Sequence, residues 1–247
     1  MKSNTYLIVN ADDLGLSQGV NSGIIEAHEQ GIVTSASLMV RWPAASDAAR
    51  YCREYPNLSV GLHFDLGEWT FTRGEWIPLY EVVSLQDEKA AGDEMFRQLA
   101  VFRDITGMDP THIDSHQHVH RSEPIQHITI EMAQSLKIPL RHFNPEICYR
   151  GDFYGQAEKG ESLPENISTD SIIHILESLQ PGITELACHP GNGDRLNTIY
   201  ETERLQELRV LCAPEVRKAI DEMGIELCSF RTIPIRKNDI YFGKIVP

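Results

Sequence analysis

The sequence predicts an α/β protein whose parallel strands and crossover helices form one closed or nearly closed β/α barrel. Short apolar runs alternate with amphipathic stretches about seven times, which is the order of elements that a parallel sheet requires. No Gly-rich dinucleotide fingerprint follows the first strand, so a barrel of about seven strands is favoured over an open sheet. The 247 residues can bury one core and contain no linker, so we expect a single domain over 1–247.

The first half of the chain is interpreted as three strands and three helices. An apolar run at 6–9 predicts a buried strand. Val20, Ile24 and Ala27 recur at helical spacing, and Gly31 is a suitable end for the helix that they predict. The predicted strands are 6–9, 34–40 and 58–64, and the predicted helices are 17–30, 43–55 and 87–106.

The second half continues the alternation. Gly107 ends the long third helix, and Pro214 breaks the last helical stretch because proline cannot continue a helix. Two long segments, 65–80 and 144–165, are rich in Gly, Pro and aromatic residues, and we expect them to be lids or binding loops. The predicted strands are 111–114, 139–143, 183–188 and 225–230, and the predicted helices are 124–136, 170–179 and a broken 201–223.

Charge and cysteine content exclude several classes of protein. The 22 Lys and Arg against 36 Asp and Glu give a net charge of −14, with no basic stripe for nucleic acid and no polybasic patch for a membrane. We expect a neutral or cationic partner, although the acidity could also serve solubility alone. The five cysteines form no CxxC pair, which argues against a disulfide scaffold and a Cys-based zinc site. The first apolar run is too short for a signal peptide, so we expect a cytoplasmic protein.

Ionisable side chains gather at the ends of the predicted strands. Asp12 and Asp13 follow the first strand, and His63 ends the third. Parallel β/α folds build their sites at that edge. A turning backbone could bring both aspartates into one pocket, where one would bind a cation and the other would act as a base. The alternatives are a helix cap or turn for the aspartates and a core histidine for His63.

The segment 111–120 carries the strongest signal. Its even positions hold His, Asp, His, His and His, which would share one face of an extended chain. Imidazoles and a carboxylate on one face suit Zn²⁺ or another divalent ion. Not all of them can contact the ion, so some of His112, His118 and His120 would orient the ligands instead.

Two further strand ends carry an ionisable group. His189 follows the strand 183–188 and would suit a general acid, with a turn residue before Pro190 as the alternative. Arg141 could hold a carboxylate or the substrate, and a surface ion pair is an equal alternative. Five separate strands thus deliver ionisable groups to one edge, a coincidence that the single-residue alternatives do not explain together.

The ordered set of motifs resembles the YdjC-like carbohydrate deacetylases, whose members include the chitooligosaccharide deacetylases. The resemblance runs from the first strand to Ser229-Phe230-Arg231. It rests on Val-Asn-Ala-Asp-Asp-Leu-Gly-Leu-Ser at 9–17, Gly-Ile-Ile-Glu-Ala at 23–27, Gly-Ile-Val-Thr-Ser at 31–35, Gly-Leu-His-Phe at 61–64, Thr-His-Ile-Asp-Ser-His-Gln-His-Val-His at 111–120 and Cys-His-Pro at 188–190.

The resemblance implies a β/α barrel related to the polysaccharide deacetylases and one divalent metal ion. Asp13, His63 and His116 match the family's metal-binding residues. Mg²⁺ is the metal usually named for the family, whereas Zn²⁺ suits two imidazoles better on chemical grounds.

The resemblance also implies a reaction, the removal of an acetyl group from a small N-acetylated saccharide of the chitooligosaccharide kind to give acetate and a free amine. Asp12 matches the catalytic base, His189 the acid and Arg141 an arginine near the base that could also bind substrate. The expected partner is therefore a small sugar and neither nucleic acid nor membrane, and a homodimer is compatible with this interpretation.

Two other functions remain open on the residues alone. A metal-dependent phosphoesterase would use the excess histidines for a second metal. A carbohydrate- or metal-binding protein without catalysis would not need both Asp12 and His189. Trp42, Trp69 and Trp76 could form a sugar platform, but core packing is as good an explanation for each.

Overall fold

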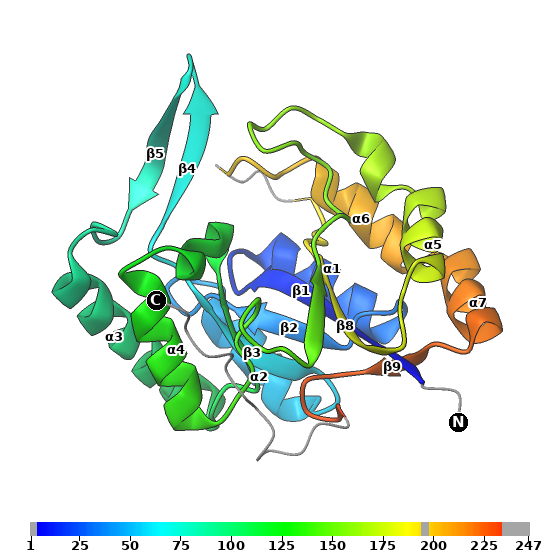
Figure 1. The fold of residues 1–247 in the computed structure, drawn as a ribbon, viewed down its shortest axis with the longest axis horizontal. Coiled ribbons are helices and arrows are strands. Elements are labelled where there is room, and N and C mark those ends of the chain that lie inside the picture. The colour runs from blue at the N-terminus through cyan, green and yellow to red at the C-terminus, as the bar shows by residue number, and fades with distance from the viewer. Residues whose placement is uncertain (1–3, 194–197, 234–247) are drawn as a thin grey trace.

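The computed structural model describes residues 4–193 and 198–233, in which a curled parallel sheet lies at the centre and helices pack outside it (Figure 1). The strands are β1 (Thr5–Leu14), β2 (Ser35–Leu38), β3 (Ser59–Phe64), β4 (Gly67–Thr72), β5 (Glu75–Glu81), β6 (Ile113–Ser115), β7 (Ile147–Arg150), β8 (Gly182–Cys188) and β9 (Glu226–Cys228). The helices are α1 (Gln18–Glu29), α2 (Ala45–Glu54), α3 (Glu88–Thr106), α4 (Ile125–Leu136), α5 (Thr169–Glu177), α6 (Glu203–Leu211) and α7 (Pro214–Met223), with the 3₁₀ turns η1 (His116–Arg121) and η2 (Pro164–Ile167).

The central sheet has the strand order β6-β3-β2-β1-β8-β7, and β9 pairs with the first part of β1. Every pairing in it is parallel, so the class predicted from the alternation of strands and helices is confirmed. Within the described residues no strand pairing joins β6 to β7, and the sheet is a curled half-barrel open on that side.

The open side differs from the sequence-based expectation. The predicted strand 139–143 contributes only an isolated bridge between Ile113 and Leu140. His142 then takes a left-handed backbone conformation with a φ of 69°, which ends the extended pairing. The edge strand is β7, which lies inside the segment that was expected to be a loop.

The helices begin and end for local reasons. Ser17 caps α1 by accepting a hydrogen bond from the Val20 amide, and Asp87 caps α3 in the same way through the Ala90 amide. Gly107, left-handed with a φ of 74°, ends α3 as predicted. The stretch 201–223 is divided into α6 and α7 at Pro214, also as predicted.

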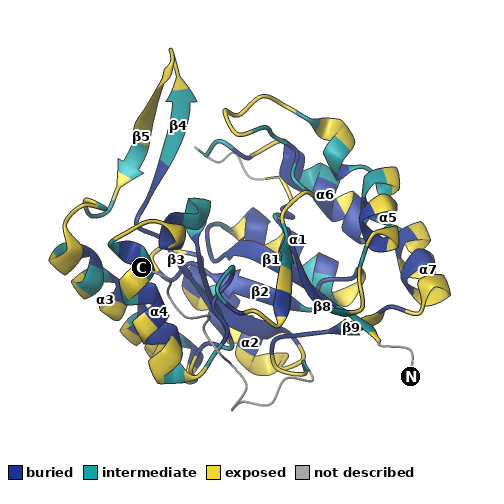
Figure 2. Cartoon of the chain, in the orientation of Figure 1, coloured by how far each residue is buried: buried dark blue, intermediate teal, exposed yellow. Residues whose placement is uncertain are grey.

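The segment 65–80 is not an irregular loop but contains most of an antiparallel hairpin, β4–β5, which projects from the central sheet (Figure 1). The base of β4 is buried, β5 has no buried residue, and the tip of the hairpin is exposed (Figure 2). Trp76 at the tip is 50% exposed, so the hairpin carries aromatic surface away from the core.

The core lies between the sheet and the helices, and its largest fully buried side chains include Phe64, Phe102 and Phe153. None of the helices in the described residues is long and apolar enough to cross a membrane.

Candidate active site

The end of β1 directs two adjacent carboxylates into one cavity. The register of β1 against β2 shifts between Ala11 and Leu14, and Asp13 has a left-handed backbone with a φ of 68°. Neighbouring side chains of a regular strand would point to opposite faces, so this irregularity lets both Asp12 and Asp13 line the cavity. The turning backbone that the sequence left open as one of two interpretations is therefore present.

Asp13, His63 and His116 meet at the end of the sheet, from β1, β3 and the start of η1. Asp13 Oδ1 lies 3.3 Å from His63 Nε2 and 3.1 Å from His116 Nδ1. One ligand atom from each residue lies within 4.8 Å of the others. The three residues that the sequence resemblance assigned to a metal thus form one cluster.

This cluster fits a divalent ion. Ligand atoms about 2.1 Å from a shared ion lie about 3.0–3.4 Å from one another, which matches both distances around Asp13 Oδ1. Burial alone would raise the pKa of Asp13, but Arg204 and the two histidines hold it well below its ordinary value. The carboxylate is therefore ionised and suited to a cation.

His63 is oriented from behind by Asp114. Its register partner across β3 and β6 is Asp114, whose Oδ1 lies 2.7 Å from His63 Nδ1, so His63 Nε2 faces the cavity side and Asp13. A carboxylate behind a histidine is the usual partner of a metal-ligating imidazole. Ser37 donates to Asp114 Oδ2 at 2.6 Å, and His112 Nε2 lies 3.1 Å from the same Ser37 hydroxyl.

Arg141 is buried and holds three carboxylates. Its guanidinium donates two hydrogen bonds to Asp12, at 2.6 and 2.8 Å, and also contacts Asp114 at 2.8 Å and Glu185 at 2.7 Å. The side chain is only 1% exposed, so the surface ion pair considered from the sequence is wrong. Its position favours the alternative in which it holds a carboxylate, that of Asp12, and contact with substrate stays a prediction. Burial raises the pKa of Glu185 to about 7 although Arg141 opposes the shift.

His189 directly follows β8 and lies close to Asp12. Its Nε2 is 3.8 Å from Asp12 Oδ2, and its Nδ1 is 3.9 Å from Glu207 Oε1. Tyr154 and Tyr200 flank the imidazole, with ring centroids 5.2 and 5.3 Å away. Burial lowers the pKa of His189 to about 4, so the imidazole is neutral near pH 7.

The segment after His189 is packed tightly against α1. A Cβ placed on Gly23 of α1 would lie 2.5 Å from the Cα of Gly191, so this approach requires glycine. The Gly191 amide also donates to the Arg204 carbonyl. The direction of the chain around His189 is thus fixed from two helices.

Two charged residues of the site were missed from the sequence. Arg204 of α6 donates to Asp13 Oδ2 at 2.7 Å, and Glu68 of β4 places Oε2 3.7 Å from His116 Nε2. A signal was available for α6, because Glu203, Arg204 and Glu207 occupy one turn of a helix that must bury a face. For Glu68 the sequence held no comparable signal.

The histidines that follow His116 do not share one face with it. The chain leaves β6 at Ser115 and enters η1, where Gln117 and His118 have positive φ values of 49° and 55°. The shared face that an extended chain would give to these histidines is therefore not formed. His118 and His120 instead approach His142, and burial lowers the pKa of these three histidines to about 2, 3 and 4 in that order.

A cavity of about 740 Å³ lies over the cluster. Trp69 and Trp76 of the hairpin line it, whereas Trp42 does not and donates through Nε1 to Asp65 at 3.0 Å. Residues 156–160 also line it, and Lys159 Nζ lies 4.9 Å from the ring centroid of Phe71 of the hairpin. The two long segments thus meet over the cavity.

Known proteins are similar to this chain in sequence. Residues 6–222 match the family model described as YdjC-like protein. The carbohydrate deacetylase of Geobacillus stearothermophilus is 35% identical over 92% of this chain and 97% of its own length. The chitooligosaccharide deacetylase of Serratia marcescens is also 35% identical, over 92% of this chain and 98% of its own.

Solved structures resemble this one as well. A protein of Enterococcus faecalis V583, named as a candidate cellobiose-phosphate cleavage protein, is 27% identical with a TM-score of 0.74 and covers 93% of this chain and 99% of its own. A family 4 carbohydrate esterase of Streptomyces lividans, solved with acetate, shares the fold at 13% identity and a TM-score of 0.54, over 93% of this chain and 96% of its own. The family resemblance found in the motifs is confirmed, and the chain belongs to the YdjC-like family.

Proposed function

We propose that this chain is a metal-dependent carbohydrate deacetylase that hydrolyses the N-acetyl group of a small saccharide to acetate and a free amine, with 1–247 acting as one catalytic domain. The observation that carries the proposal is the position of Asp12. Asp12 directly precedes Asp13 of the Asp13, His63 and His116 cluster in the sequence. Its Oδ2 atom also lies 3.8 Å from His189 Nε2, and both side chains line the cavity. A base, an acid candidate and a cation site thus line one cavity, and both curated relatives are named for deacetylation.

Asp13, His63 and His116 would hold the ion. When bound, it supplies Lewis-acid polarisation of the acetyl carbonyl and of the attacking water. One carboxylate and two imidazoles suit Zn²⁺ well, while Mg²⁺, the metal expected from the family, prefers a set of oxygen ligands. The ion that restores acetate release after chelation distinguishes the two.

Asp12 acts as the base. A water molecule attacks the acetyl carbon and forms the new C–O bond while its proton passes to Asp12. The two hydrogen bonds from Arg141 fix the carboxylate in one orientation, so Arg141 is a positioning residue for this step.

His189 carries the proton to the leaving group. Because its pKa is about 4, it is neutral in the free protein near pH 7 and must first receive the proton that it donates. Asp12 Oδ2, 3.8 Å from Nε2, is the nearby source. The proton passes from Asp12 to His189 and then to the amide nitrogen of the substrate as the C–N bond breaks, which yields acetate and the amine.

The cavity suits a short sugar. The hairpin and residues 156–160 meet above it, so its walls favour the end of an oligomer over a continuous polymer. Trp69 and Trp76 offer aromatic faces to a sugar ring. A di- or tri-N-acetylated chitooligosaccharide is therefore the first substrate to test.

The test measures acetate release from N-acetylglucosamine, from di- and tri-N-acetylated chitooligosaccharides and from insoluble chitin, with Asp12→Asn as the matched inactive control. We expect release from the oligosaccharides and a loss of roughly 10²-fold or more in the variant. Release from the polymer alone would contradict the short-sugar proposal, and release from none of them would remove its support.

A phosphoesterase is the second candidate, because the Enterococcus neighbour is named for a sugar phosphate. Adding cellobiose phosphate to the panel and measuring inorganic phosphate distinguishes it. Phosphate release without acetate release would replace the deacetylase proposal.

A further inference from the structure

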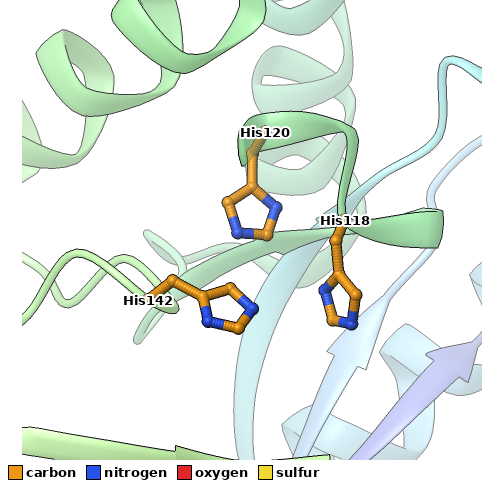
Figure 3. A group of neighbouring side chains, drawn as sticks. All are labelled: His118, His120 and His142. Carbon is orange, nitrogen blue, oxygen red and sulfur yellow. The ribbon is translucent and has the colours of Figure 1, made fainter. Parts of the chain in front are cut away.

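Three histidines outside the proposed catalytic cluster turn toward one another at the open side of the half-barrel. His118 and His120 come from η1, and His142 comes from the segment before β7 (Figure 3). One nitrogen from each lies within 4.8 Å of the others. The ring centroids are separated by 5.1 Å for His118 and His142, 5.7 Å for His120 and His142, and 5.9 Å for His118 and His120.

The nitrogens of this cluster lack partners on the side where the rings converge. No hydrogen bond of the described residues reaches His118 Nδ1, His120 Nε2 or His142 Nε2, although all three atoms are buried. The opposite nitrogen of His120 lies 2.6 Å from Ser115 Oγ, and that of His118 lies 3.3 Å from the Tyr149 hydroxyl. Outer contacts of this kind fix the ring orientation of histidines that bind metals.

The backbone around the cluster is also unusual. His118 and His142 both have left-handed conformations, with φ values of 55° and 69°. Such conformations are uncommon for residues other than glycine, and they concentrate at functional sites. The backbone at His118 and His142 is therefore strained in the conformation in which their rings lie beside His120.

We propose that His118, His120 and His142 form a second metal site, which takes a first-row transition-metal ion such as Zn²⁺. An all-imidazole set binds zinc, copper or nickel and disfavours Mg²⁺, which requires oxygen ligands. This separates the site from the cluster of Asp13, which contains a carboxylate. Three histidines leave a fourth coordination position open for water. His142 is partly exposed, so an ion can enter from solvent.

The second ion would act on the wall of the active-site cavity. His118 and Tyr149 both line that cavity, and the Tyr149 ring lies 5.1 Å from the Arg141 guanidinium carbon. A bound ion would tie η1 to the segment before β7, two parts of the chain that lie beyond the isolated bridge between Ile113 and Leu140 and that no strand pairing joins within the described residues. The proposed role is thus to hold the wall beside Arg141 in place.

The test counts zinc in the full chain. The protein is stripped with a chelator, loaded with Zn²⁺, desalted and measured by plasma mass spectrometry, and the cobalt-loaded form is followed by its visible absorption. His142→Asn and His142→Gly are the variants, because both residues tolerate the left-handed backbone. His127→Ala, an exposed histidine of α4, is the matched control.

We expect two equivalents of zinc in the unchanged protein and in His127→Ala, and one in both His142 variants, with part of the cobalt spectrum lost. Circular dichroism establishes that the variants are folded. Equal zinc content and equal cobalt spectra in the unchanged protein and the folded His142 variants would overturn the proposal, whatever the activity of the enzyme.

Discussion

Replacing Asp114 with asparagine tests whether the carboxylate behind His63 prepares the metal cluster. Asp114 is fully buried and contacts His63 Nδ1 at 2.7 Å, the Ser37 hydroxyl at 2.6 Å and Arg141 at 2.8 Å. Burial would raise its pKa, but Arg141 and His63 hold the pKa well below its ordinary value. Asparagine keeps the shape and removes the charge that orients His63.

Two magnitudes follow from these contacts. Loss of a carboxylate behind a metal-ligating histidine costs about 10- to 100-fold in metal affinity, or about 1.4–2.8 kcal/mol. Breaking a buried ion pair costs about 3–5 kcal/mol of folding stability. Arg141 retains Asp12 and Glu185, so we expect a loss at the lower end, about 3 kcal/mol.

The assay measures Zn²⁺ affinity by chelator competition and unfolding by urea for Asp114→Asn. Glu185→Gln is the matched control, because Glu185 contacts Arg141 but is not among the hydrogen-bond partners of His63. We expect the control to lose stability while its metal affinity is kept. A folded Asp114→Asn protein with affinity within about twofold of the unchanged protein would refute the role of Asp114.

Three other predictions concern the same site. Asp12→Asn should keep the metal in equilibrium dialysis and lose roughly 10²-fold in acetate release, whereas Asp13→Asn should lose both, and the reverse pattern would exchange their roles. Chelation should stop acetate release, and added Zn²⁺ or Mg²⁺ should restore it, so full activity after complete metal removal would contradict a metal-dependent reaction. Burial raises the pKa of Glu207 from an ordinary 4.5 to about 8, so the folded protein binds more protons than the unfolded chain between these values. This contribution to the free energy of unfolding is present below about pH 4.5 and is lost as the pH rises through 8. Urea unfolding should therefore show a smaller decrease in the free energy of unfolding between pH 5 and pH 8 for Glu207→Gln than for the unchanged protein.

The sequence was informative where the site depends on strand ends. The ends of parallel strands meet at one edge, so the order of strands predicted that ionisable residues gather there, and the family resemblance selected Asp13, His63 and His116 among them. Arg204 and Glu68 could not, because one projects from a helix and the other from a hairpin outside the central sheet, and strand order does not place either.

The edge of the sheet was the weakest prediction for a related reason. Residues 139–143 have a strand-like composition, but the left-handed backbone at His142 ends the pairing after Leu140. Local apolar patterns record burial and carry little information about such a reversal. The same limit applies to 111–120, where the alternation of histidines would place them on one face only if the chain stayed extended, and the chain instead turns after Ser115.

The hairpin β4–β5 forms part of the wall of the active-site cavity. The backbone of Trp69 exchanges two hydrogen bonds with the side chain of Gln117, so the base of the hairpin is clamped to the turn that carries His116 while its tip is exposed. Lengthening or shortening the tip would therefore change how long a proposed sugar substrate can be without altering the central sheet. Variation in the length of this hairpin would thus change the accepted length of the substrate while the residues at the edge of the sheet stay in place.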